Sequence, residues 1–366
     1  PGATGQPVTR DEDYFSYIQT LQLRQPLYRK PLMAGLDQAR HIVEEAEATL
    51  EQTLQELGQR VTSAYLEVLL ANDQVAIVDQ QRQMLEVQLD AAEKALRAGS
   101  GIRTDIDEAR ARLDLNRADA LQARQNLDHA HRQLELLIGR PVGTVVPVDA
   151  ERLPLLPPDP PAFQDWVALA ESTSPEIDAL RARVEAARAE VAKMSGGHYP
   201  TLDAVAAYSR SGSENVTAPD TRYKNWVLGL QFSLPIYQGG MISSQVRQAL
   251  AQQTRAEELL EAARRDLSLR LHREYRGVTE GVLRVQAFEQ AVHSAGQLAH
   301  SSRRAFEAGS RTRVDILNAE HTLQLARRDL AQARYQYLLS RLRLALLAGS
   351  DRRLAIEEIN GWLLRR

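Results

Sequence analysis

The stretch Phe306-Glu307-Ala308-Gly309-Ser310-Arg311-Thr312-Arg313-Val314-Asp315-Ile316-Leu317 decides the fold. A long helical pattern runs up to Gly309 and a second begins after Thr312, which predicts a tight turn between two antiparallel helices. A counterpart occurs earlier, at Leu96-Arg97-Ala98-Gly99-Ser100-Gly101-Ile102-Arg103-Thr104-Asp105-Ile106. The two stretches are related by one offset, because 309 − 99 and 315 − 105 both equal 210. The chain therefore contains an internal repeat, and each turn is called a helix tip below.

Long helical patterns lead into both tips. Residues 33–98 and 241–308 contain no proline, and helices of that length would span roughly 100 Å. Such helices need neighbours along their whole length. After each tip, residues recur at alternating spacings of three and four, the pattern of a coiled-coil seam. The first seam is Ile106, Ala109, Leu113, Asn116, Ala120, Ala123, Leu127, Ala130, Leu134 and Leu137, and the second is Ile316, Ala319, Leu323, Ala326, Leu330, Ala333, Tyr337, Ser340, Leu344 and Leu347.

A weaker stripe on the last long helical pattern consists of Leu325, Leu339 and Leu346. This stripe predicts a second neighbour for that helix. Contacts on two sides favour a closed ring of helices over a free two-helix coil.

Three stretches alternate between apolar and polar residues with the period of a β-strand. They cover residues 14–27, 201–209 and 225–236, and a polar loop at 210–223 separates the last two. Strands of about 9 to 11 residues cross an outer membrane when tilted, so the last two stretches predict a membrane hairpin. The side chains expected to face the membrane are Phe15, Tyr17, Leu21, Leu23, Trp226, Leu228, Leu230, Phe232 and Leu234.

Composition excludes several classes of function. The net charge is −3, with 43% hydrophobic and 25% charged residues, so the basic excess of a nucleic-acid-binding protein is missing. Cysteine is absent, and the eight histidines show no metal-ligand spacing. The sequence contains no nucleophile elbow, phosphate loop or paired-carboxylate motif. We therefore expect no metal site, no cofactor and no enzymatic activity.

The repeat predicts the domain organisation. Residues 1–139 form a first repeat of strand, long helix, tip and shorter helix, and 140–161 form a proline-rich linker. Residues 162–349 form a second repeat that begins with an additional helix and strand, and 350–366 form a C-terminal segment. Because the first repeat lacks those additional elements, we expect the natural chain to extend before Pro1.

At this point the residues resemble a known family. The duplicated unit, the strand exit Leu234-Pro235-Ile236-Tyr237-Gln238-Gly239-Gly240 and the Phe-x-x-Gly-x-Arg-Thr-x-x-Asp-Ile-Leu tip at 306–317 resemble the TolC family of outer-membrane efflux and secretion channels. The resemblance covers residues 14–349. It implies a mainly α fold with a transmembrane β portion. Three subunits would form a 12-stranded β-barrel in the outer membrane of a Gram-negative bacterium, continuous with a long periplasmic α-helical barrel.

The resemblance also implies a gate at the tips. Phe306 would lie at this gate, and polar contacts involving Arg311 and Asp105 would hold it closed. Asp315 would face the pore in a ring of three, although it is also suited to stabilising the first turn of a helix. Asn318 stands where the family carries a second pore-lining aspartate, so the ring would hold fewer charges.

Partners follow from the same resemblance. The tips would contact a periplasmic adaptor through Gly99, Ser100, Gly101, Gly309 and Ser310. Gly99 and Gly309 are also suited to left-handed helix caps. Outer-membrane lipid would surround the strands. The C-terminal residues 356–362 resemble members that serve type I protein secretion, which implies an inner-membrane ABC exporter.

Other functions stay open on the sequence. A multidrug efflux duct working with an RND pump fits the same features. A periplasmic adaptor also contains a long helical hairpin, and a soluble coiled-coil scaffold would share the seams. The alternation from Trp226 to Ile236 argues against the adaptor, which should lack membrane strands. Extraction would distinguish the scaffold, which should be soluble without detergent, from a channel, which should appear as trimers in outer-membrane fractions.

Overall fold

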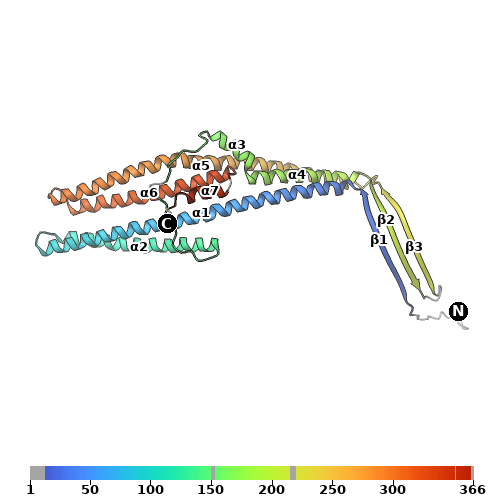
Figure 1. Cartoon of the computed structure of the whole chain (residues 1–366), viewed down its shortest axis with the longest axis horizontal. Helices are drawn as coiled ribbons and strands as arrows, with labels where there is room; N and C mark the ends of the chain where they lie inside the picture. The colour runs from blue at the N-terminus through green and yellow to red at the C-terminus, as the bar shows by residue number, and fades with distance from the viewer. Residues whose placement is uncertain (1–12, 150–152, 215–219, 351, 364–366) are drawn as a thin grey trace. The chain divides into compact units, whose positions relative to one another are not determined.

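The computed structural model describes residues 13–149, 153–214, 220–350 and 352–363 of the protein. The chain is mainly helical, as predicted, with one small sheet (Figure 1). Its elements are β1 Ser16–Tyr28, α1 Lys30–Arg97, α2 Arg103–Ile138, α3 Phe163–Thr173, α4 Pro175–Ser195, a 3-10 turn Gly196–His198, β2 Thr201–Ser213, β3 Thr221–Ser233, α5 Met241–Glu307, α6 Arg313–Leu347 and α7 Arg352–Asn360. The order β1-α1-α2 recurs as β3-α5-α6. No helix in the described ranges has the length and apolarity needed to cross a membrane.

Within the described residues the chain forms two compact units. One comprises Pro1–Ala46 with Leu180–Leu260, and contains the sheet. The other comprises Glu47–Ala179 with Glu261–Arg366, and contains both tips.

The sheet is antiparallel, in the order β1-β2-β3. Its register places residues in cross-strand rows, and alternate rows share a face. Leu21, Tyr208 and Trp226 form one row, and Leu23, Ala206 and Leu228 form the next row on that face. Apolar side chains therefore cover one face in the middle of the sheet, as the alternation predicts.

The strand ends differ from the sequence-based expectation. Both β2 and β3 extend into the predicted loop, because Arg210 and Tyr223 belong to paired strand residues. Phe15 and Leu234 lie just outside β1 and β3, although both are exposed. The strand ends are predicted from the alternation of apolar and polar residues. Strand residues beyond the apolar band are polar and do not alternate, so the sequence does not show that the strands continue there.

A register shift lies between Pro26 and Tyr28. Leu27 is the extra residue, so Tyr28 and not Leu27 pairs with Leu202 and continues the apolar face. A bulge of this kind moves every following side chain by one position.

A buried carboxylate joins the sheet to the start of α1. The Asp203 side chain is 1% exposed, and its Oδ2 lies 2.5 Å from Arg24 Nη2 and 2.6 Å from Arg29 Nη2. Arg29 also donates from Nε to Asp203 Oδ1 at 2.8 Å. Two guanidinium groups thus compensate one buried charge where β1 leads into α1.

The seam of α2 is confirmed by burial. Eight of its ten predicted positions are buried, and the other two, Leu127 and Leu137, pack against a core cluster. This cluster contains Ala64, Val68 and Ala71 of α1. The first hairpin, α1 with α2, is therefore closed by the predicted coiled-coil contact.

The second stripe of α6 is confirmed only in part, because of its three predicted residues Leu346 is buried and Leu339 is half-buried. Leu325 is 37% exposed. The buried residues outside the seam are Leu317, Glu320, Gln324, Tyr335, Leu338, Leu342 and Leu346. Leu317 packs with Leu85 of α1 and Leu113 of α2, so part of this second side faces the first hairpin. Polar residues at 320 and 324 hide this side from a search for apolar stripes.

Three tyrosines hold the linker between the repeats, and two of them, Tyr65 and Tyr275, are related by the 210-residue offset. Tyr65 on α1 donates to Val146 O at 2.8 Å, and Tyr275 on α5 donates to Pro161 O at 2.5 Å. Tyr337 on α6 donates to Leu156 O at 3.0 Å. These hydroxyls satisfy carbonyl groups of a linker whose described residues, 140–149 and 153–161, form no helix or strand.

Three helices end in the same Ala-Gly-Ser cap. Gly99, Gly309 and Gly349 have φ values of 75°, 74° and 70°. The serine after each glycine donates its N–H to a carbonyl five residues earlier, which is the Schellman arrangement. The predicted caps at the two tips are confirmed, and the third cap ends α6.

The three caps differ in their surroundings, which yields a matched test. An added Cβ meets nothing at Gly99 or Gly309, but at Gly349 it collides with the backbone of Thr173. We expect Gly309→Ala to lower the free energy of unfolding by about 1 kcal/mol through backbone strain. Gly349→Ala should cost about 1–3 kcal/mol more. Urea unfolding followed by circular dichroism measures both, and equal losses would contradict the packing of α3 against the end of α6.

Candidate functional site

The two tips share a backbone but differ in how the next helix begins. Thr312 is the N-cap of α6, and Asp315 N donates to Thr312 Oγ1 at 3.3 Å. In return, Thr312 N and Thr312 Oγ1 each donate to Asp315 Oδ2 at 2.8 Å. This is a complete capping box. At the first tip the N-cap is Ile102, which cannot form one, so Asp105 makes no such contact.

This difference gives the equivalent aspartates different roles. Asp315 is held against its own helix as a first-turn acid, which was the simpler of its two predicted roles. Hydrogen bonds from the N–H and the hydroxyl of Thr312, together with the charge of Arg311, lower the pKa of Asp315 from its ordinary value of 3.8. The predicted ring of three pore-facing carboxylates remains a prediction.

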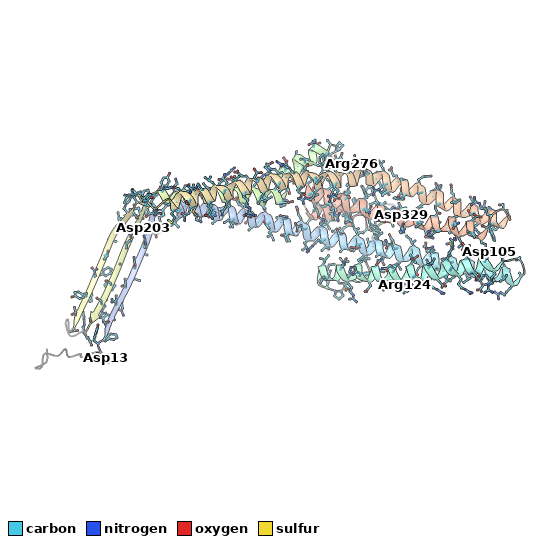
Figure 2. All side chains as sticks on the ribbon, turned by 180° about the vertical axis from the view of Figure 1, so that it is seen from behind. Asp13, Asp105, Arg124, Asp203, Arg276 and Asp329 are labelled. Carbon is cyan, nitrogen blue, oxygen red and sulfur yellow. The ribbon has the colours of Figure 1, made fainter. Side chains whose placement is uncertain are left out.

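Asp105 instead bridges the two hairpins. Its Oδ2 lies 3.5 Å from Nε of Arg313, at the start of α6, and both side chains are less than a quarter exposed. Figure 2 shows Asp105 near the tip end of α2. The guanidinium of Arg313 also lies 5.0 Å from the ring centroid of Phe306, so Phe306 helps to orient it.

Within the chain, Asp105 is paired with Arg313 and not with the predicted Arg311, whose role at the gate remains a prediction. Arg311 donates to Ser302 Oγ of α5 at 3.3 Å, and Arg313 takes the place predicted for it beside Asp105. The sequence favoured Arg311 only through the family resemblance. Arg313 is in the first turn of α6, and a helical wheel alone does not reveal that this turn faces α2.

Asn318 contributes a further link between the hairpins. Its Oδ1 accepts a hydrogen bond from Arg112 Nη2 at 2.9 Å, and Arg112 also pairs with Glu108 at 2.8 Å. The Asn318 amide is thus engaged with α2. Arg112 was not predicted as a site residue.

The tip glycines and serines form the ends of the hairpins, where Gly99, Ser100, Gly309 and Ser310 are exposed and Gly101 is half-buried. Ser100 Oγ donates to Ala95 O at 3.3 Å, and Ser310 Oγ donates to Ala305 O at 2.9 Å. A Cβ at Gly101 would lie 2.7 Å from Leu96 N, so the first tip requires glycine there, whereas the equivalent position of the second tip holds Arg311. Their predicted contact with an adaptor remains a prediction.

An ion pair with a buried carboxylate, located behind the tips, was missed by the sequence analysis. The Glu320 side chain on α6 is 2% exposed, and its Oε1 lies 2.5 Å from Arg303 Nη2 of α5. Its other oxygen, Oε2, accepts a hydrogen bond from Gln88 Nε2 of α1 at 2.5 Å. One carboxylate therefore connects both helices of the second hairpin to the first hairpin.

The internal repeat contained a signal for this pair. Subtracting 210 from 303 and 320 gives Glu93 and Arg110, which form an exposed ion pair at 3.3 Å. The two repeats thus carry the same bridge with its charges exchanged. A complementary exchange of this kind indicates that the two positions are in contact in both hairpins.

Further polar links continue along the interface between the hairpins. Tyr335 on α6 donates to Asp73 Oδ2 of α1 at 2.9 Å, and Arg327 donates to Gln80 Oε1 at 3.3 Å. Burial raises the pKa of Asp73 above its ordinary value. Together with the apolar contact of Leu317, these links hold α6 against the first hairpin by many small interactions.

The polar side chains at the tips form contacts between helices, and their arrangement suggests a structural role. Within the described parts of the chain, no cluster of three or more His, Asp or Glu side chains could hold a metal ion. The polar groups at the tips bind one another across two hairpins. What this geometry can do is hold the hairpins together or let them separate.

Comparison with known proteins gives this geometry a context. The family model described as outer membrane efflux protein matches residues 3–140 and 166–350. The alkaline protease secretion protein AprF of Pseudomonas aeruginosa is 33% identical over 351 residues, covering 93% of this chain and 71% of the relative. The outer membrane protein TolC of Escherichia coli K12 is 31% identical over 343 residues, covering 90% and 69%. A solved structure of CusC shares the fold, with a TM-score of 0.79 at 16% identity, covering 92% of this chain and 84% of the other.

The capping box predicts a pH dependence at the second tip. Because the pKa of Asp315 is lowered by folding, its stabilisation is present above the ordinary pKa of 3.8 and is lost as the pH falls through the lowered value. We expect hydrogen exchange in the first turn of α6 to accelerate, after correction for the intrinsic rate, only below about pH 4. Thr312→Ala should expose this turn at neutral pH, and an unchanged profile in that variant would contradict the capping role.

The exchanged ion pairs provide a second test with an internal control. Arg303→Gln leaves the Glu320 carboxylate buried without its cation, so we expect the free energy of unfolding to fall by about 1–3 kcal/mol. Arg110→Gln breaks the exposed pair at the equivalent position and should cost less than about 1 kcal/mol. Chemical denaturation of both variants measures the difference, and losses of the same size would show that the burial of Glu320 does not matter.

Proposed function

Because the chain belongs to the outer membrane efflux protein family, we propose that it is the exit duct of an export system and that its helix tips are the gate. The resemblance to the TolC family is confirmed, and the protein is located in the outer membrane of a Gram-negative bacterium. Family members are passive channels, so the duct does no chemistry on its cargo. The family match and the sheet favour a duct over a periplasmic adaptor or a coiled-coil scaffold.

One observation carries the gate proposal. The polar side-chain contacts between the two hairpins that lie nearest the tips are Asp105–Arg313, Arg112–Asn318 and Gln88–Glu320. A partly exposed pair of this kind contributes about 0–1 kcal/mol. A few such contacts keep a gate closed in isolation, yet a partner that binds the open state more tightly can shift the balance.

The opening motion follows from where these contacts lie. All three join the α5/α6 hairpin, through α6, to the α1/α2 hairpin. In contrast, Arg303–Glu320 and Arg334–Glu289 hold α5 to α6. We therefore expect the second hairpin to move as one body away from the first.

The gate would be formed by three subunits and would contact an adaptor. Channels of this family form homotrimers, and three copies of the gate would surround one pore with Asp315 facing it. The tips, including Gly99, Ser100, Gly101, Gly309 and Ser310, would be the contact for a periplasmic adaptor. The repeat boundaries predicted from the sequence would then separate the two hairpins of each subunit.

Protein secretion is the proposed use of the duct, with an ABC exporter as the inner-membrane component. Similarity to a relative named for alkaline protease secretion, over 93% of the chain, supports this choice. The alternative is multidrug efflux with an RND pump, which the family description favours. Deletion of the gene should abolish export of a protein cargo under the first proposal. Sensitivity to small toxic compounds without a secretion defect would favour the second.

The gate proposal predicts a change in conductance. Arg313→Ser removes both the contact with Asp105 and the stacking on Phe306, so the open state should be favoured about fivefold per subunit, corresponding to about 1 kcal/mol. Single-channel recording in planar lipid bilayers measures this as a larger current. Arg311→Ser should have a smaller effect, because Arg311 contacts Ser302 on its own hairpin.

Arg117→Ser is the control for this experiment. It breaks an exposed pair with Asp114 on α2 and should leave the current unchanged. A current in Arg313→Ser equal to that of the wild type and of this control would contradict the gate assignment.

A further inference from the structure

Cationic side chains gather at one end of the sheet's apolar face. In the register, Gln19, Arg210 and Lys224 form the row that follows Leu21, Tyr208 and Trp226 on that face. The next row on the same face contains Tyr17, Gly212 and Arg222. Successive rows on one face are about 7 Å apart. The surface therefore changes from apolar to cationic within a single row, next to the loop between β2 and β3.

The cations are held at the surface and not neutralised inside the sheet. Arg210, Arg222 and Lys224 are all exposed. The Arg210 guanidinium lies 5.9 Å from the Tyr17 ring, and that ring lies across Gly212, where a Cβ would collide with it. Arg222 pairs with Asp220 at 3.0 Å. Among the described residues, no carboxylate pairs with Arg210 or Lys224.

The acidic side chains at this end lie further from the apolar band. Glu214 follows β2, its N–H bonded to Phe15 O at 3.2 Å, and Asp220 precedes β3. The order along the face is thus apolar, cationic and then mixed. Arg210 and Lys224 occupy the boundary itself, on neighbouring paired strands about 5 Å apart.

The opposite end of the same face is different. The row of Tyr28, Leu202 and Phe232 carries no charge. Lys30 stacks on the Tyr199 ring at 3.6 Å, and Arg29 is bound to Asp203. The charge is therefore asymmetric along the membrane-facing band, which suits a membrane whose two surfaces differ in their headgroups.

We propose that Arg210 and Lys224, with Arg222 beside them, bind the phosphate groups of an outer-leaflet lipid of the lipid A type. This inference rests on the proposed function, because it needs the apolar face to lie in the outer membrane with the β2–β3 loop outward. The acyl chains would lie along Leu21, Trp226 and Leu228. The lipid would contact the cations through its phosphate groups and the apolar rows through its acyl chains. Free phosphate has no acyl chains, so it would gain nothing from the apolar rows.

The test measures retention of lipid by the purified trimer. Native mass spectrometry would compare bisphosphorylated lipid A with its enzymatically dephosphorylated form, for the wild type and for the double variant Arg210→Gln, Lys224→Gln. The wild type should prefer the phosphorylated lipid, and the double variant should bind it about 25-fold more weakly, the product of about fivefold per cation. Millimolar inorganic phosphate should not displace the lipid.

A matched control removes two cations elsewhere. Arg117→Gln with Arg132→Gln changes two exposed arginines of α2 and should retain the lipid as the wild type does. Equal retention by the double variant, no preference for phosphorylated lipid in the wild type, or displacement by inorganic phosphate would each overturn the proposal. Channel recording in phospholipid bilayers separates the two claims, because a protein that conducts without preferring phosphorylated lipid is a duct without this site.

Discussion

The structure depends on covering helices that are too long to be stable alone. α1 has 68 residues and α5 has 67, and most helical stability in proteins comes from packing and not from intrinsic propensity. The seams of α2 and α6 provide that packing near the tips. Their small residues, such as Ala109, Ala123, Ala319 and Ala333, allow close approach. Because the seams close each hairpin separately, the contact between hairpins is left to individually weak polar contacts and a small apolar cluster. A stable hairpin beside a weak interface is the physical basis of a gate.

Duplication supplied two equivalent hairpins, and a few substitutions made them unequal. Thr312 binds Asp315 to its own helix, whereas Ile102 leaves Asp105 to reach Arg313. The ion pair behind the tips has an exposed carboxylate in one hairpin and a buried carboxylate in the other, and its charges are exchanged. The backbone is repeated, while the polar contacts are not. The two hairpins therefore contribute different polar groups to the contact between them, and under the gate proposal the α5/α6 hairpin is the one that moves away from the α1/α2 hairpin.

Much of the fold could be predicted because it follows from local periodicity. The seam of α2, the glycine caps and the apolar face of the sheet all depend on spacing along the chain. The errors occur where a contact partner decides the outcome. The bulge before Tyr28, the polar strand residues Arg210 and Tyr223, and the buried Glu320 have no periodic signal. Arg313 was missed as the partner of Asp105 for the same reason, since its role depends on which face of α6 meets α2.

The account requires the second hairpin to leave the first when the duct opens. The absence of cysteine from the chain allows a direct test with Arg112→Cys and Asn318→Cys, whose native side chains are joined across the two hairpins at 2.9 Å. A short, reducible bis-thiol cross-linker would tie the hairpins together, and export of the cargo would be measured before and after reduction. The account predicts that cross-linked ducts do not export and that reduction restores export. Export at the normal rate through fully cross-linked ducts would contradict it.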